Sequence, residues 1–184
     1  MTVRLFFALT PSPAESLAID HWRQRMLPPF SHPVPPQNLH LTLVFLGEVE
    51  QRQLESIIEQ ADEVQGSSFS IKLTELGYFP KPRVLWIGPH DTPEEAIELA
   101  RQLKRIPRRL GFKTERRDFQ AHLTIARRCE LPPPASASPP NFDLSFDTFG
   151  LFESRSVRGG VRYDRLAEWP LGDRAPIVNP TRPA

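Results

Sequence analysis

The sequence predicts an α+β fold with two pseudo-symmetric lobes, each an antiparallel sheet with helices packed on its outer face, around a central cleft. Two observations lead to this prediction. A four-residue pattern of histidine, apolar, threonine, apolar occurs at residues 40–43 (HLTL) and recurs 82 positions later at residues 122–125 (HLTI). Each copy lies in a strand-like apolar run, and each half of the chain also offers another strand and a helix with a strong start signal. We interpret this pattern as a degenerate internal duplication.

The composition is that of a globular protein, with 39% hydrophobic and 24% charged residues in a chain of 184. The single cysteine, Cys129, excludes an intramolecular disulfide and a cage of several cysteines around a metal. It favours a reducing, cytoplasmic setting. The apolar residues 3–9 are too few for a secretory signal, and we find no run long enough to cross a bilayer, so no membrane association is expected.

The first elements along the chain are a strand, a helix and the first motif strand. Residues 3–9, which are apolar except for Arg4, are typical of a buried strand. The sequence SPAE at residues 12–15 is a capping box with proline at the first helical position, and the helix should end before Pro28. After a proline-rich stretch, residues 39–46 form the first motif strand, which we expect to end at Gly47.

Helical spacing of apolar residues follows at 54–61. Residues 69–73 alternate between apolar and polar side chains as an amphipathic strand does. Residues 77–82 contain glycine and prolines and predict a turn, and residues 84–87 form another short apolar strand.

The second half begins in the same way. The sequence TPEE at residues 92–95 predicts a second capping box, opening a helix that Pro107 should end or kink. The second motif strand follows at residues 121–127, and residues 132–140 predict a flexible, exposed loop. This order repeats the helix and motif strand of the first half.

The closing elements are strands and a tail. Alternating side chains over residues 142–152 predict one strand, and the glycine pair at 159–160 predicts a hairpin turn into a strand at 161–169. We expect residues 1–172 to form a single bilobal domain and residues 173–184 to be a flexible C-terminal tail, because the tail is polar and proline-rich.

The net charge of +1 hides a basic segment. Residues 101–128 hold ten basic residues against two acidic ones, and they end at the second motif. Such an excess would attract a polyanion such as RNA. The alternative is a solvated helix face in a chain rich in arginine, and the charge run alone favours this alternative.

The motif residues suit phosphate chemistry without a metal. Side chains alternate along a strand, so His40 shares a face with Thr42, and His122 shares a face with Thr124. One imidazole can remove a proton while a second donates one, because the ordinary pKa of histidine lies near neutral pH. A threonine hydroxyl can donate a hydrogen bond to a phosphate oxygen. Arg127 is the candidate cation, but on a regular strand it would face away, so a bulge or the strand end must redirect it.

Other chemistries find less support. Neither motif has a second His, Cys, Asp or Glu within two positions, which disfavours a metal site, and we find no P-loop or G-x-S-x-G sequence. Four aromatic residues in apolar strands could stack on a base, but we interpret them as core: Phe45, Tyr78, Phe79 and Trp86.

The motifs in their context resemble the two-histidine (2H) phosphoesterase superfamily, and specifically the bacterial and archaeal RNA 2′,3′-cyclic phosphodiesterases, also called 2′-5′ RNA ligases. The resemblance covers nearly the whole chain. It is carried by residues 4–9 (RLFFAL), 38–48 (NLHLTLVFLGE), 77–87 (GYFPKPRVLWI) and 119–127 (FQAHLTIAR), and by the closing strands. One departure is the Gln-Ala pair at 120–121, where relatives often have proline directly before the histidine.

The resemblance implies a role for each motif residue. His40 would donate a proton to the leaving oxygen, and His122 would activate water. Thr42 and Thr124 would hold the phosphate, and Arg127 would contact it. The implied substrate is an RNA 2′,3′-cyclic phosphate end, opened to a 2′-phosphate by a monomer that needs no cofactor. Reversal would join RNA ends through a 2′-5′ bond without ATP. Two alternatives remain open: a phosphodiesterase for a small cyclic nucleotide, and a non-catalytic module that binds RNA ends.

Overall fold

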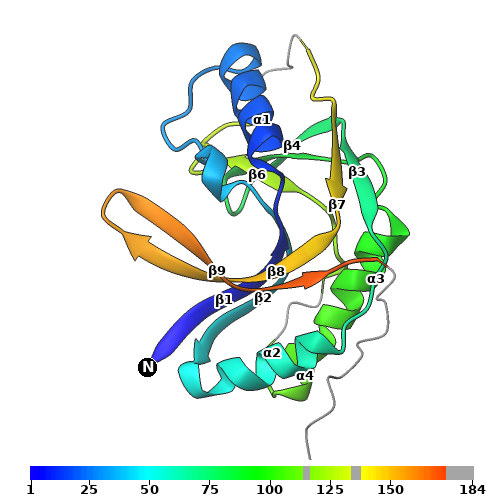
Figure 1. The fold of residues 1–184 in the computed structure, drawn as a ribbon. Helices are drawn as coiled ribbons and strands as arrows, with labels where there is room; N and C mark the ends of the chain where they lie inside the picture. The colour runs from blue at the N-terminus through cyan, green and yellow to red at the C-terminus, as the bar shows by residue number, and fades with distance from the viewer. Residues whose placement is uncertain (114–116, 134–137, 173–184) are drawn as a thin grey trace, which may run out of the picture.

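The structure, a computed structural model, describes residues 1–113, 117–133 and 138–172 (Figure 1). Its strands are β1 (Thr2–Leu9), β2 (Leu41–Glu50), β3 (Phe69–Leu73), β4 (Glu75–Phe79), β5 (Val84–Gly88), β6 (Leu123–Ala126), β7 (Phe142–Phe146), β8 (Thr148–Val157) and β9 (Gly160–Pro170). Its helices are α1 (Pro13–Met26), α2 (Leu54–Asp62), α3 (Glu94–Leu103) and α4 (Arg105–Arg109), with single 3₁₀ turns η1 (Pro36–Asn38) and η2 (Gln51–Gln53).

Seven strands form one sheet in the order β4-β5-β6-β2-β1-β8-β9, and every neighbouring pair is antiparallel. The sheet is weakest between β2 and β6, where Leu41 and Leu123 are the one registered pair among the described residues. This junction separates lobe one (β2, β1, β8 and β9) from lobe two (β4, β5 and β6). The predicted α+β fold with two antiparallel lobes is therefore confirmed, and the two lobes share one continuous sheet.

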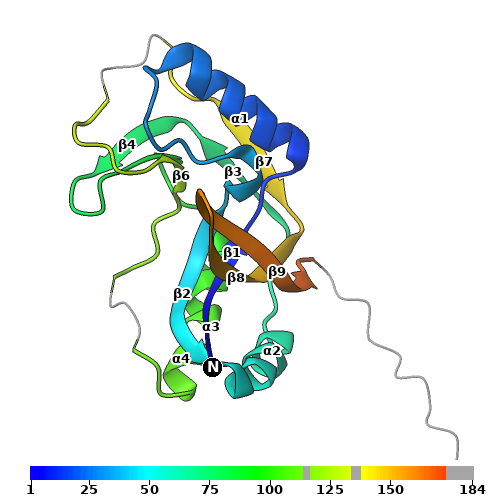
Figure 2. The ribbon, with the colours of Figure 1, turned by 90° about the vertical axis from the view of Figure 1, so that its left-hand side faces the viewer.

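The lobes do not correspond to the two halves of the chain. Helix α3, from the second half, contacts β2, which carries the first motif. Helix α1, from the first half, reaches β6 of the second motif through a hydrogen bond from Arg23 to the carbonyl of Ile125. Figures 1 and 2 show α1 at one end of the molecule and α2, α3 and α4 at the other. Helices α1 and α3 thus each contact the motif strand of the other half.

Strand β1 is the central strand of the core. Leu5, Phe7 and Leu9 are fully buried in the main hydrophobic cluster, which draws residues from both lobes. On the opposite face of β1, Phe6 and Ala8 form a second, smaller cluster with Phe152 of β8. Burial on both faces explains why residues 5–9 are a continuous apolar run.

Three predicted strand boundaries are wrong. β2 does not end at Gly47, whose φ of 74° lies in the left-handed region that glycine adopts without strain; the strand continues to Glu50. The predicted turn at 77–82 is shorter, because residues 77–79 belong to β4 and pair with β5. The single strand predicted at 142–152 is interrupted at Asp147, since β7 pairs with β3 in a separate two-stranded sheet while β8 joins the main sheet.

The first capping box is confirmed and the second is not. The amide of Ser12 donates to Glu15 Oε2 at 2.7 Å, and the amide of Glu15 donates to Ser12 Oγ at 3.2 Å. At the start of α3, Thr92 instead accepts a hydrogen bond at 3.4 Å from the amide of Ala121, next to the second motif. A tertiary partner has replaced the local one.

Pro107 neither ends nor kinks the helix before it, because α3 already ends at Leu103. It lies at the third position of α4, where a backbone N–H has no partner within the helix in any case. The predicted flexible tail at 173–184 and residues 134–137 of the predicted loop lie outside the described residues.

Candidate active site

The two motifs meet at the junction of the lobes. Because Leu41 pairs with Leu123 in an antiparallel register, His40 lies across from Thr124, and Thr42 lies across from His122. All four side chains share one face of the sheet and are half-buried, while Leu41 and Leu123 point into the core. Diagonal neighbours in such a pair are roughly 7–8 Å apart. The structure therefore brings four of the five predicted site residues together, with the imidazoles on one diagonal.

Both imidazoles are oriented by the same local hydrogen bond. Nδ1 of His40 lies 2.7 Å from the carbonyl oxygen of Asn38, and Nδ1 of His122 lies 2.9 Å from that of Gln120. A carbonyl can only accept, so Nδ1 carries the proton in each ring. In the neutral form, Nε2 then has the free lone pair. Each histidine thus presents the nitrogen that can take up or release a proton.

Burial and nearby charges change the pKa of His40. Burial lowers the pKa of His40 to about 4, against a smaller opposing effect from its hydrogen bond to Asn38. The electrostatic effects of Arg127 and His122 contribute to this lowering. These two groups are therefore close enough to His40 to act on the same small region. A bound anion would offset both effects and favour the imidazolium form of His40.

Arg127 reaches this face because β6 contains a bulge. Leu85 pairs with Ala126 and Trp86 pairs with Thr124, so Ile125 has no counterpart on β5. One extra residue reverses the alternation of side chains, and Arg127 therefore emerges on the same side as Thr124. The sequence required a bulge or the strand end to redirect Arg127, and β6 contains that bulge.

The bulge is held by an arginine that sequence reasoning missed. The carbonyl of Ile125 accepts hydrogen bonds from Arg23 Nη1 at 2.7 Å and from the amide of Val34 at 3.0 Å. Arg23 also donates to the carbonyl of Val34 at 2.7 Å and pairs with Asp20 on the same helix. It is 6% exposed, although an arginine in an amphipathic helix is usually solvated. We find no sequence signal that would have identified it.

Aromatic rings surround both imidazoles. The ring of His40 lies 5.0 Å from that of Phe6 and 4.9 Å, edge-on, from that of Tyr163. The ring of His122 lies 5.2 Å, edge-on, from Phe79 and 6.3 Å from Trp86. Neither Phe6 nor Tyr163 was singled out from the sequence, because their contacts with His40 arise only in the tertiary structure.

The four aromatic residues interpreted as core differ in their environments. Trp86 is buried, and Tyr78 is half-buried with its hydroxyl donating to the carbonyl of Cys129 at 2.7 Å. Phe79 is half-buried against His122. Phe45 is 52% exposed, so its interpretation as a core residue is wrong.

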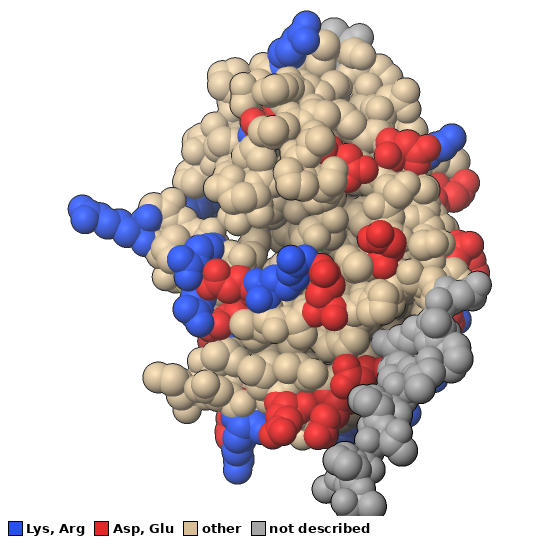
Figure 3. All heavy atoms as spheres, viewed as in Figure 1, with Lys and Arg blue, Asp and Glu red and all other residues tan. Residues whose placement is uncertain are grey.

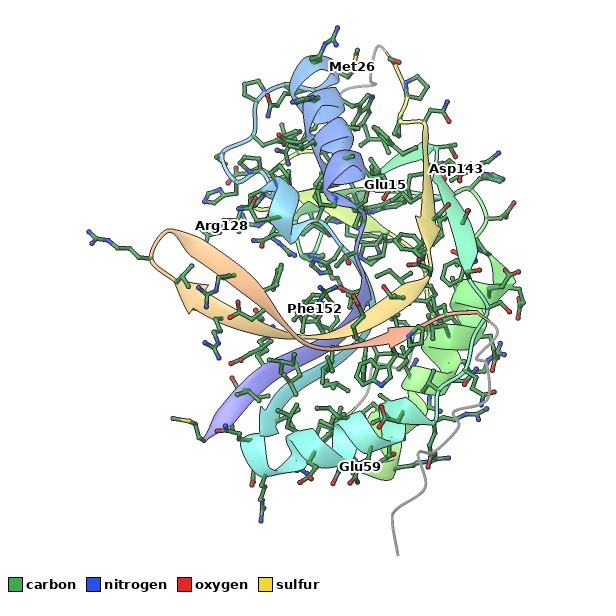
Figure 4. All side chains as sticks on the ribbon, in the orientation of Figure 1. Glu15, Met26, Glu59, Arg128, Asp143 and Phe152 are labelled. Atoms are coloured by element: carbon green, nitrogen blue, oxygen red, sulfur yellow. The ribbon has the colours of Figure 1, made fainter. Side chains whose placement is uncertain are left out.

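Much of the basic segment lies away from this site. Arg101 pairs with Glu98 on α3, and Arg109 lies 3.6 Å from Glu63. On the face shown in Figure 3, acidic and basic side chains are mixed. Arg128, labelled in Figure 4, has its Nη1 atom 3.3 Å from Nε2 of His32. On α3 and α4 the charge run is a solvated helix face, and its last residues reach the candidate active site.

The described residues contain no group of three or more His, Cys, Asp and Glu arranged to hold a metal ion. In the same part of the chain, none of the helices has the length and apolar character needed to span a membrane.

The duplicated site has a counterpart in known proteins. Residues 11–86 and 87–163 each match the family model described as LigT-like phosphoesterase, so one match falls on each half and each contains one motif. The chain belongs to the LigT-like phosphoesterases. The family confirms the resemblance noted from the sequence.

Relatives of this LigT-like phosphoesterase span nearly its whole length. An RNA 2′,3′-cyclic phosphodiesterase of Escherichia coli is 34% identical over 171 residues, covering 91% of this chain and 96% of the relative. One from Archaeoglobus fulgidus is 38% identical over 128 residues, covering 68% and 70%. The crystal structure of E. coli LigT complexed with 3′-AMP superposes with a TM-score of 0.86 at 32% identity, covering 94% of this chain and all of that one.

Proposed function

We propose that this LigT-like phosphoesterase hydrolyses 2′,3′-cyclic phosphate ends of RNA to 2′-phosphates, acting as a monomer through paired-histidine acid–base catalysis without a metal. One observation carries the proposal: two imidazoles with the same Nδ1 anchor lie diagonally on one face, each across from a threonine. That arrangement suits an in-line displacement, in which water enters opposite the leaving oxygen and each needs its own proton-transfer group.

In this mechanism His122 is the base and His40 is the acid. Nε2 of His122 takes a proton from water as its oxygen bonds to phosphorus. The bond from phosphorus to the ribose 3′ oxygen breaks, and protonated Nε2 of His40 gives that oxygen its proton. The anionic substrate raises the pKa of His40 from its low value in the empty site, so the acid is charged when it is needed.

The remaining site residues stabilise the phosphoryl group. The hydroxyls of Thr42 and Thr124 donate hydrogen bonds to its non-bridging oxygens, and Arg127 compensates the charge that builds up on them. The same groups serve the reverse reaction, in which a 5′-hydroxyl RNA attacks in place of water. We therefore include ATP-independent 2′-5′ ligation in the proposal as the reversal of the cleavage.

The relatives support the choice of substrate. Those from E. coli and A. fulgidus are named RNA 2′,3′-cyclic phosphodiesterases. Solved complexes of E. coli LigT contain 3′-AMP, ATP and NADP⁺, which all join an adenosine to phosphate. We expect the corresponding site of this chain to accept a nucleotide that carries a phosphate group.

The test is the hydrolysis of a defined oligonucleotide that ends in a 2′,3′-cyclic phosphate. We expect a 2′-phosphate product, a loss of about 10²–10⁴-fold in kcat/KM for His40→Ala and for His122→Ala, and no effect of EDTA. His21→Ala, which removes an exposed histidine from α1, is the matched control. Full activity in either active-site variant would overturn the mechanism, and a 3′-phosphate product would overturn the assignment of the leaving oxygen.

The same assay separates the alternatives. Faster turnover of a mononucleotide cyclic phosphate than of the oligonucleotide would identify a small cyclic nucleotide as the substrate. Tight binding of the oligonucleotide with no hydrolysis would identify a binding module.

A further inference from the structure

The residue that orients the first catalytic imidazole is itself tied to another part of the fold. Asn38, whose carbonyl oxygen lies 2.7 Å from Nδ1 of His40, also donates a hydrogen bond of 2.8 Å from Nδ2 to the carbonyl of Val161 in β9. We infer that Asn38 is a positioning residue, which fixes the orientation of the His40 imidazole by attaching it to the hairpin of β8 and β9. The inference deepens the proposed function and rests on it, since it concerns the group that protonates the leaving oxygen.

The chemistry of the two hydrogen bonds fixes the direction of each. A carbonyl oxygen only accepts, so the atom of the Asn38 side chain that faces Val161 is the amide nitrogen, as the ring nitrogen that faces Asn38 is a donor. Asn38 therefore accepts from the imidazole with its main chain and donates to the hairpin with its side chain. Without that donor, the carbonyl that holds Nδ1 would lose its support from β9.

Local structure holds this carbonyl weakly. Asn38 is the last residue of η1, a single 3₁₀ turn without a side-chain cap, and β2 begins only at Leu41, after His40. The hydrogen bonds of a 3₁₀ turn have poorer geometry than those of an α-helix, so one turn constrains the backbone little. The segment that presents His40 therefore depends on tertiary contacts, and the bond to Val161 joins residues 123 positions apart.

Strand β9 acts on the imidazole by a second route. Val161 and Tyr163 are two positions apart on this strand, so their side chains share a face. The ring of Tyr163 lies 4.9 Å, edge-on, from that of His40 and 5.1 Å, edge-on, from that of Phe6. The hairpin, which projects from the body of the molecule (orange in Figure 1), thus holds both the ring of His40 and the residue that orients it. Such support limits rotation of a proton donor that must be aligned with the oxygen it protonates.

The second histidine is held by a different part of the molecule. Gln120 stands in the place of Asn38, two residues before His122, and its exposed side chain makes no hydrogen bond to another of the described residues. The next amide, that of Ala121, instead donates at 3.4 Å to Thr92, just before α3. The two catalytic groups depend on separate elements, so a change at Asn38 should disturb His40 and leave His122 as it is.

The first test measures the tautomer of each histidine in the free protein by long-range ¹H–¹⁵N NMR at about pH 7. In the wild type we expect the proton on Nδ1 of both His40 and His122. Asn38→Ala should shift His40 toward the Nε2-protonated form and leave His122 unchanged, because the hydrogen bond to one ring nitrogen sets which nitrogen is protonated. Asn38→Gln keeps a carboxamide donor and should retain more of the Nδ1 form. An unchanged His40 in Asn38→Ala, or equal changes at both histidines, would overturn the inference.

The second test is the hydrolysis of the cyclic oligonucleotide. For Asn38→Ala we expect kcat to fall about 10–100-fold through misalignment of the acid, and KM to stay within about twofold, because the threonines and Arg127 still hold the phosphate. Asn38→Gln should recover part of the loss. Asn141→Ala, which removes an exposed asparagine just before β7, should change neither constant.

The two tests fail in different ways. A rise in KM with unchanged kcat would overturn positioning by Asn38 in favour of substrate binding, as unchanged kinetics would overturn its role altogether. A wild-type protein that does not hydrolyse the oligonucleotide would overturn the proposed function, and the NMR spectra would still decide whether Asn38 orients His40.

Discussion

A glycine in β4 provides the space for the indole that lies beside the imidazole of His122. The indole of Trp86 lies flat across Gly77, so a Cβ atom there would stand 2.0 Å from Cζ2 of the indole. Trp86 is also paired with Thr124 and lies against His122. The absence of a side chain at residue 77 thus allows the indole of Trp86 to lie between Gly77 and His122.

We therefore expect Gly77→Ala to damage both stability and activity. The new methyl group must push the indole toward His122, and such overpacking costs about 1–3 kcal/mol of the free energy of unfolding. Turnover of the cyclic oligonucleotide should fall about tenfold with it. Urea unfolding and steady-state kinetics measure the two effects. Gly160→Ala is the control, because a Cβ there meets nothing within 4 Å. Equal behaviour of the two variants would contradict this account of Gly77.

At the scale of elements, the bulges decide which side chains reach the site. A strand presents alternate residues to each face, and one unpaired residue exchanges the faces for everything beyond it. Alternation correctly predicts that His40, Thr42, His122 and Thr124 point the same way in their strands. It fails for Phe45, because Leu43 has no counterpart on β1 and the side chains beyond it change faces. The pairing with β1 creates this bulge, and the sequence of β2 alone does not show it.

Removal of the side chain that holds the second bulge tests this interpretation. Arg23→Met leaves Asp20 as an uncompensated buried charge and removes a donor from Ile125, so we expect a loss of about 3–5 kcal/mol in the free energy of unfolding. Where the variant stays folded, KM for the cyclic oligonucleotide should rise as Arg127 loses its position. Denaturant unfolding and kinetics measure these effects. Arg25→Met, on the exposed side of the same helix, should change neither, and an effect of the same size there would refute the role of Arg23.

At the scale of the whole molecule, the exchange of helices between the halves makes the chain one folding unit. Helix α1 donates a hydrogen bond to the second motif strand and α3 contacts the first, so each motif strand is in contact with a helix of the other half. We expect a single cooperative transition, in which the burial of His40 at the junction contributes to the pH dependence of the whole fold.

The predicted pH dependence follows from the low pKa of His40. The imidazole takes up a proton near pH 6.5 in the unfolded chain and only near pH 4 in the folded one. Between these values the unfolded state binds the additional proton, so the free energy of unfolding falls as the pH is lowered, by at most about 3 kcal/mol. Urea unfolding at about pH 7 and about pH 4.5 measures the loss. His40→Gln should reduce it and His21→Gln should not; the same loss in all three proteins would show that His40 does not contribute.

The sequence by itself determined the fold class, most of the strands and helices, and the pairing of histidine with threonine on each motif strand. These features follow from local periodicity, capping residues and the alternation of side chains, which neighbouring residues along the chain control. Where they failed, as at Thr92 and at the break in residues 142–152, a distant partner competed with the local preference.

Only the tertiary structure decided which side chains beyond the motifs lie on the same face as the two histidines. Arg127 and Phe45 owe their direction to the register of β6 against β5 and of β2 against β1. Arg23 owes its burial to the packing of α1 on the other half of the chain. Register and helix packing depend on contacts between residues far apart in the chain, so no local pattern in the sequence could have specified them.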